Sequence, residues 1–145
     1  MLKNRICLIN EYEDKKYLNI LKNFWEKNVG MKTIIVSPHL HDKILSITSH
    51  LPHLISFLYI YFIKSKKFKN LKKFSGPYFE DFTRVADNNF KMWTEIFLSN
   101  RDEILNYGYQ FVEYLNNLLN FLKKSEYDKI LKFLKDVKKS YRKVL

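Results

Sequence analysis

Two short segments of the chain hold side chains that could bind a small anionic molecule with an apolar body. In the first segment, Ser49 and His53 are four residues apart and so share one face of a predicted helix. The second contains Arg84, with Asp81 three residues before it and Trp93 nine after it. Arginine grips a carboxylate through its planar fork, serine and histidine form hydrogen bonds, and tryptophan supplies an apolar wall. Together these residues predict a pocket for such a molecule.

Each of these residues also has a simpler structural interpretation. His53 lies among apolar neighbours, where a histidine is often a core residue bonded to a backbone carbonyl. Arg84 could form a local ion pair with Asp81, worth about 0.3–0.5 kcal/mol. Trp93 could belong to the core. The residue types alone leave both interpretations open.

Metal and dinucleotide sites are not predicted. His39, His41 and Asp42 suggest metal ligation, but side chains two residues apart on a helix point to nearly opposite sides, and no cysteine completes a set. The three glycines are isolated from one another, so no Gly-rich phosphate loop exists; they are Gly30, Gly76 and Gly108. We therefore expect no metal site and no cofactor-binding residue in this sequence.

Composition predicts a packed helical protein. The 145 residues are 46% hydrophobic and 17% aromatic, with only 3 glycines and 3 prolines. The net charge of +11 comes mostly from scattered lysines, which favours solvated faces over a nucleic-acid interface. A single cysteine, Cys7, fits a reducing cytoplasm, and the longest apolar run, Leu51–Ile63, is shorter than the roughly 20 residues that span a bilayer. We expect a cytoplasmic protein without membrane contact.

The order of elements predicts a mainly α-helical domain behind the end of another domain. Strands at Ile6–Ile9 and Thr33–Val36 flank a helix at Tyr12–Asn28 that Gly30 ends, which makes one βαβ unit of a larger parallel sheet. Five helices are expected afterwards, over residues 39–63 with a kink at Pro52, 79–86, 87 or 88 to 99, 100–123, and 125 to the end. Asp87 or Asn88 can cap the third of these helices, Asn100 to Glu103 has the form of a capping box at the start of the fourth, and Ser125 repeats that signal before the fifth. We place the domain boundary between residues 37 and 38.

The chain resembles the prephenate/arogenate dehydrogenase family of tyrosine biosynthesis over about its first 120 residues. The specific signatures are the string from Ser49 to His53 and the string from Asp81 to Arg84 followed by Trp93. Asn4-Arg5-Ile6-Cys7-Leu8 is similar to a late strand of the family's Rossmann domain. The fold class implied is the family's helical dimerisation domain, preceded by a remnant βαβ unit of that Rossmann domain.

The resemblance implies a function for the matching residues. Family members oxidise prephenate or arogenate with NAD or NADP: a hydride leaves the ring, and the ring carboxylate departs as carbon dioxide. By this likeness Arg84 would pair with a substrate carboxylate, Ser49 and His53 would contact the substrate, and Trp93 would line the pocket. Asp81 and the Gly76 loop would lie near the site, within a homodimer. The loop before Asp81 has fewer glycines than is usual in the family, which leaves the match of Gly76 open.

The family's nucleotide-binding turn and catalytic histidine match nothing in this sequence. We therefore expect the isolated chain to bind prephenate, arogenate or tyrosine and to dimerise, without catalysis and without bound cofactor. Such a chain could be truncated, partnered by a separate Rossmann-domain chain, or read from an internal start. The alternatives are a non-catalytic basic helical module that binds nucleic acid or protein, of which nucleic acid is disfavoured, and a tyrosine-sensing domain.

Overall fold

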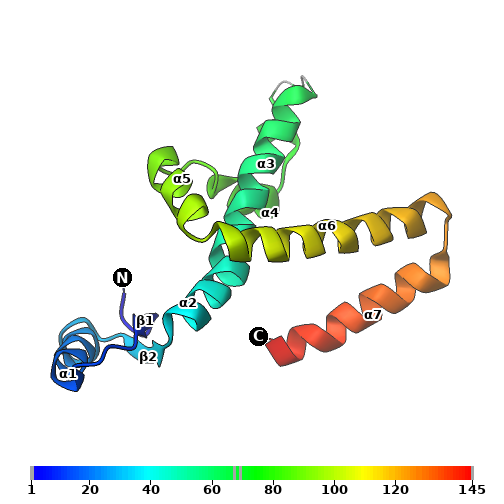
Figure 1. Ribbon diagram of the computed structural model, residues 1–145. Coiled ribbons are helices and arrows are strands. Elements are labelled where there is room, and N and C mark those ends of the chain that lie inside the picture. The colour runs from blue at the N-terminus through cyan, green and yellow to red at the C-terminus, as the bar shows by residue number, and fades with distance from the viewer. Residues whose placement is uncertain (1, 67, 69, 145) are drawn as a thin grey trace. The chain divides into compact units, whose positions relative to one another are not determined.

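A computed structural model describes residues 2–66, 68 and 70–144. The fold is mainly helical with a two-stranded parallel sheet, as the sequence predicted (Figure 1). The chain forms two compact units, Met1–Ile104 and Leu105–Leu145. The domain boundary placed after residue 37 stays a prediction.

The first unit begins with the predicted βαβ unit. Strands β1 (Ile6–Asn10) and β2 (Lys32–Val36) pair in parallel with Ile9 opposite Ile35. Helix α1 (Lys15–Asn23) continues as a π-helical segment, Phe24–Val29. The helix starts three residues later than predicted, because the carboxylate of Asp14 accepts a hydrogen bond from the Lys16 N–H and so caps the helix.

A glycine ends this first helical stretch, as the sequence predicted. Gly30 has φ 78°, the left-handed conformation, and its N–H donates to the Trp25 carbonyl. The sheet that follows buries little: Ile9 and Val36 are buried, whereas Ile34 and Ile35 stay 46% and 45% exposed. The two strands thus leave much of their apolar surface uncovered.

One continuous helical run extends from Pro38 to Ser65. It consists of α2 (Pro38–Leu45), a π-helical segment η2 (Ser46–His50) and α3 (Leu51–Ser65). The sequence predicted a kink at Pro52, and the π-helical segment lies directly before it, where the Leu51 N–H bonds to the Ser46 carbonyl. A proline cannot donate to the preceding turn, and a π-type turn is one way in which a helix accommodates this.

Three more elements complete the first unit. A short 3₁₀ turn, η3 (Leu71–Phe74), precedes α4 (Pro77–Arg84) and α5 (Phe90–Ser99). The cap of α5 is Asn89, whose side chain accepts from the Met92 N–H, so the prediction of Asp87 or Asn88 was wrong.

The second unit is a helical hairpin. Helix α6 (Arg101–Lys123) begins in the first unit and runs into the second, where α7 (Tyr127–Val144) follows a short turn (Figure 1). The serine cap predicted at Ser125 was wrong, because this residue has φ 52° and lies in the turn itself. Phe121 and Phe133 line a shared cavity near the turn.

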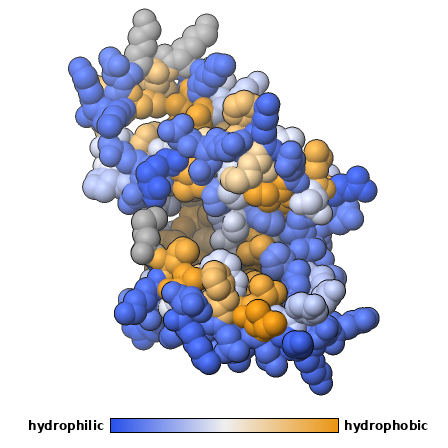
Figure 2. All heavy atoms as spheres, turned by 90° about the vertical axis from the view of Figure 1, so that its left-hand side faces the viewer, coloured by the Kyte–Doolittle hydropathy of each residue, from blue (hydrophilic) through white to orange (hydrophobic). Residues whose placement is uncertain are grey.

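Apolar side chains reach the surface over both units, and Figure 2 shows them in patches among hydrophilic residues on one face. Within the described residues, the run Pro38–Ser65 is long and apolar enough to cross a membrane, since an 18-residue window of it has a mean hydropathy of 1.2. This run is longer than the apolar run identified from the sequence. Core helices of water-soluble proteins meet the same criterion. The absence of membrane contact stays a prediction.

Candidate substrate-binding site

The site is built around a stack of two aromatic rings. The His53 ring lies against the Trp93 indole, with centroids 3.8 Å apart and planes inclined by 22°. His53 comes from α3 and Trp93 from α5, and further aromatic rings surround the indole: Phe57 at 6.4 Å and Phe97 at 5.4 Å. Trp93 is buried, and its Nε1 has no hydrogen-bond partner among the described residues. The stack thus gives an apolar wall, and an imidazole lies flat against it.

The protonation of His53 follows from its hydrogen bond. Its Nδ1 lies 2.7 Å from the Ser49 carbonyl oxygen, and a carbonyl can only accept. In neutral His53, Nδ1 therefore holds the proton and Nε2 keeps a lone pair. The simpler interpretation, a histidine satisfied by a backbone carbonyl, is thus correct for Nδ1. It leaves Nε2 available to a ligand.

His50 has the opposite arrangement. The side-chain amide nitrogen of Asn100 lies 2.9 Å from the Asp42 carbonyl oxygen and 3.0 Å from Nδ1 of His50. Because a carbonyl can only accept, this amide atom must be the NH₂ group, and its second hydrogen points to an accepting Nδ1. The proton of neutral His50 is therefore on Nε2. Burial lowers the pKa of His50, which the nearby Asp42 carboxylate opposes and His41 and His53 reinforce.

Asn100 is the residue that the sequence interpretation missed. It was predicted to open α6 as part of a capping box with Glu103. The Asn100 N–H instead bonds to the Ile96 carbonyl, and its amide reaches 58 residues back to Asp42. Glu103 keeps one buried oxygen without a partner, and its other oxygen is 3.9 Å from Nδ1 of His39. The only sequence signal was an asparagine between two helices, which also fits a cap.

A hydrogen bond from a serine hydroxyl joins α3 to α4. Ser56, one turn after His53, is 1% exposed, and its Oγ donates to the Phe82 carbonyl at 2.8 Å. Phe82 lies two residues before Arg84. This hydrogen bond therefore helps to position α4, the helix that contains Arg84, the residue predicted to bind a substrate carboxylate.

Arg84 is exposed and lines an open surface cavity of about 390 Å³. Its walls come from α3, η3 and α4 and include Lys72, Ser75 and Glu80. The two cations and the hydroxyl suit an anion, while Glu80 reduces the net positive charge. Within the described residues, no hydrogen bond or aromatic contact joins Arg84 to the stacked pair of His53 and Trp93.

The structure brings together part of the predicted pocket. Ser49, His53 and Trp93 form one cluster, Arg84 lines a separate cavity, and Asp81 and Gly76 are exposed. The alternative ion pair between Asp81 and Arg84 is not formed among the described side chains. Gly76 has open space around its Cα, so nothing in this structure requires a glycine there. Lys67 and Lys69, two of the chain's scattered lysines, lie outside the described residues.

The βαβ unit does not fit a dinucleotide. In nucleotide-binding units a Gly-rich turn after the strand lets a pyrophosphate reach the free N–H groups of the helix. Here the turn after β1 contains Glu11 and Glu13, and the Asp14 carboxylate already occupies the N–H of Lys16. Three carboxylates at that position would repel a pyrophosphate.

Comparisons with known proteins agree on one family. Residues 37–136 match the family model described as "Prephenate dehydrogenase, dimerization domain". The prephenate dehydrogenase of Bacillus subtilis is 26% identical over 129 residues, which cover 86% of this chain and 34% of that protein. The cyclohexadienyl dehydrogenase of Zymomonas mobilis is 28% identical over 123 residues, covering 83% of this chain and 42% of that protein. The chain thus spans about a third to two-fifths of these relatives.

A solved structure shows the same arrangement of elements. Prephenate dehydrogenase from Aquifex aeolicus, in complex with hydroxyphenyl propionate and NAD⁺, superposes with a TM-score of 0.85 at 28% identity. The match covers 99% of this chain and 51% of that one. Synechocystis arogenate dehydrogenase shares the fold with a TM-score of 0.77 at 20% identity and 99% coverage of this chain.

Proposed function

Because this chain belongs to the prephenate dehydrogenase family, we propose that it is the substrate-binding and dimerising part of a prephenate or arogenate dehydrogenase. The complete reaction would move a hydride from the cyclohexadiene ring to NAD(P)⁺. The ring carboxylate would leave as carbon dioxide, and prephenate would become 4-hydroxyphenylpyruvate. The matched region of this chain corresponds to the dimerisation domain of that family.

The stack of His53 on Trp93 is the observation that carries this proposal. A flat six-membered ring needs an apolar wall, and Trp93 with its neighbouring phenylalanines supplies one. The lone pair on Nε2 of His53 supplies an acceptor, which a ring hydroxyl can satisfy. Ser49, one turn before His53 and half-buried, adds a hydroxyl on the same helix face.

Arg84 would supply the charge that selects a carboxylate. Its cavity also contains Lys72, so the region has two cations for a substrate that has two carboxylates. We place Asp81 and Gly76 in the loop and helix that present Arg84, and not in direct contact with substrate.

Nucleotide binding is assigned to another part of the enzyme. The carboxylates after β1 disfavour a pyrophosphate in this βαβ unit. The nicotinamide nucleotide, which accepts the hydride when bound, would therefore be held by a Rossmann-type fold outside these 145 residues. That fold could belong to the same protein or to a separate chain.

Isothermal titration calorimetry with 3-(4-hydroxyphenyl)propionate tests the proposal. This probe has an aromatic ring, a hydroxyl and one carboxylate. We expect binding that weakens about 10- to 100-fold in Arg84→Ala, since a hydrogen bond to a charged group contributes about 1.5–3 kcal/mol. Arg101→Ala is the matched control, because Arg101 is exposed and, within the part of the chain that the structure describes, pairs only with its neighbour Asp102. No binding by the folded wild-type chain, or equal binding by both variants, would contradict the proposal.

A further inference from the structure

Two histidines beside Trp93 are held in opposite tautomers. His53 donates from Nδ1 to the Ser49 carbonyl, which leaves a lone pair on Nε2. His50 accepts at Nδ1 from Asn100, which leaves the hydrogen on Nε2. Both rings contact the same indole: His53 lies flat on it, and His50 meets it at 80° with centroids 6.3 Å apart.

The tautomer of His50 depends on Asn100 alone. Among the described residues, Asn100 is the one hydrogen-bond partner of the His50 ring. Both groups are buried, with 8% of His50 and 7% of Asn100 exposed, so water competes little for the bond. The second amide hydrogen is fixed on the Asp42 carbonyl, which prevents the amide from turning over.

We propose that Asn100 is a positioning residue: its bonds to the Asp42 carbonyl and to His50 hold His50 neutral, as an Nε2–H donor beside Trp93. The wall of the site then offers one histidine donor, His50, and one histidine acceptor, His53. A hydroxyl group of a ligand can use both, because it accepts and donates. The relevance to ligand binding rests on the proposed function, whereas the tautomer itself does not.

Replacing Asn100 by aspartate would reverse the direction of the hydrogen bond to His50. A carboxylate can only accept, so Asn100→Asp would draw the hydrogen of His50 to Nδ1. It would also stabilise the imidazolium and raise the pKa of His50 above its ordinary value. The other titratable groups around His50 are Asp42, His41 and His53, and the substitution leaves them unchanged.

Long-range ¹H–¹⁵N correlation spectra of the full ¹⁵N-labelled chain at pH 8 test the proposal. In the wild type we expect the Nε2–H form for His50 and the Nδ1–H form for His53. In Asn100→Asp we expect the Nδ1–H form for His50 with His53 unchanged. Asn116→Asp, an exposed change in α6, should alter neither ring. An Nδ1–H form of His50 in the wild type would overturn the proposal, and this result does not require the variant to fold.

The pH profile of 3-(4-hydroxyphenyl)propionate binding adds a readout that loss of packing would not move. We expect the inflection that belongs to His50 below pH 6.5 in the wild type and above it in Asn100→Asp. An inflection that stays in place in a folded Asn100→Asp chain would count against a positioning role. Absent ligand binding together with the expected tautomers would contradict the proposed function and leave the tautomer assignment supported.

Discussion

His53 and Trp93 are forty positions apart in the sequence, yet their rings stack with centroids 3.8 Å apart. The contact joins α3 to α5, and Trp93 is among the few large side chains that this protein buries. A ring stack of this kind contributes about 0.5–1.5 kcal/mol beyond the area that it buries. The same contact thus supports the fold and forms the wall of the candidate site.

Trp93→Ala should therefore lower the free energy of unfolding by about 3–5 kcal/mol. Trp93→Phe should cost less, because phenylalanine keeps an aromatic ring and removes an indole N–H that is buried without a partner. Trp25→Ala is the control, since Trp25 is only half-buried. Urea unfolding followed by circular dichroism measures all three. Equal losses for the two alanine variants would show that Trp93 is not a core residue.

Ser56 is a second residue that contributes both to stability and to the arrangement of the candidate site. Ser56→Ala removes the bond to the Phe82 carbonyl and leaves that carbonyl without this partner, at a cost of about 1–3 kcal/mol. Ser56→Val should cost more, because the side chain is 1% exposed and added atoms in a packed interior are destabilising. Ser65→Ala on the same helical run should change stability by less than about 0.5 kcal/mol, since its exposed hydroxyl bonds only within its own helix. Denaturant titration measures the free energy of unfolding of the three variants. Equal values for all three would show that Ser56 makes no specific contribution to stability.

The pH dependence of stability should show a step from His50. Burial lowers the folded-state pKa of His50 below its ordinary 6.5, so the unfolded chain binds more protons between the two values. Stability is then complete above pH 6.5, declines as the pH falls toward the folded-state pKa, and levels off below it with respect to this group. Urea midpoints from pH 7.5 to 5 measure the step. His39→Gln, which removes an exposed histidine, should leave this step in stability in place. His50→Gln should abolish the step.

Local sequence signals predicted the element types well and their exact ends less well. The strands, the glycine that ends the first helical stretch, and the helices from Pro38 onward follow from apolar periodicity and from turn residues. The cap of α5 was misplaced because Asp87, Asn88 and Asn89 are all good capping residues, and only the fold decides that Asn89 is used.

The candidate site was predictable only as far as it is local. Ser49 and His53 share a helix face, which spacing alone indicates. The bond from Asn100 to His50 spans fifty positions, and no spacing rule reports such a contact. Arg84 was grouped with Trp93 by sequence proximity and by resemblance, yet Arg84 lines a cavity whose lining does not include Trp93. Contacts between residues far apart in the sequence depend on how the helices pack, and a single sequence does not show this packing.

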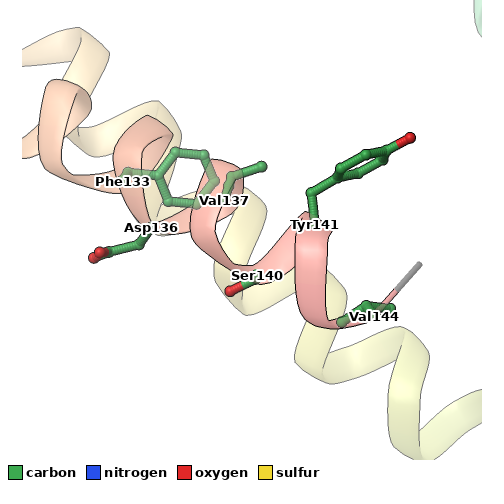
Figure 3. A pocket seen from close by; sticks show the side chains of 6 residues that line it. All are labelled: Phe133, Asp136, Val137, Ser140, Tyr141 and Val144. Carbon is green, nitrogen blue, oxygen red and sulfur yellow. The ribbon is translucent and has the colours of Figure 1, made fainter.

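The hairpin of α6 and α7 leaves two apolar seams uncovered. On α6 four of the exposed apolar residues follow the three-and-four spacing of a coiled coil, and they are Val112, Leu115, Leu119 and Leu122. On α7 the same spacing recurs in Leu134, Val137, Tyr141 and Val144. Figure 3 shows Phe133, Val137 and Tyr141 following one another along α7, with Val144 at its end. Each of the eight seam residues is 44–77% exposed, which is a large apolar surface for a monomer to leave in water.

A second copy of the chain is the occupant that we expect for these seams, in accord with the dimerisation domain that the sequence matches. Val137→Asp would place a charge in the α7 seam and should raise the dimer dissociation constant at least about tenfold, equivalent to about 1.4 kcal/mol. Lys138→Asp changes an adjacent exposed residue outside the seam and should have a small effect. Sedimentation equilibrium over a range of concentrations measures both constants. A monomeric wild type would refute the dimer, and its transfer to lipid vesicles would show that the apolar surfaces are covered by a membrane instead.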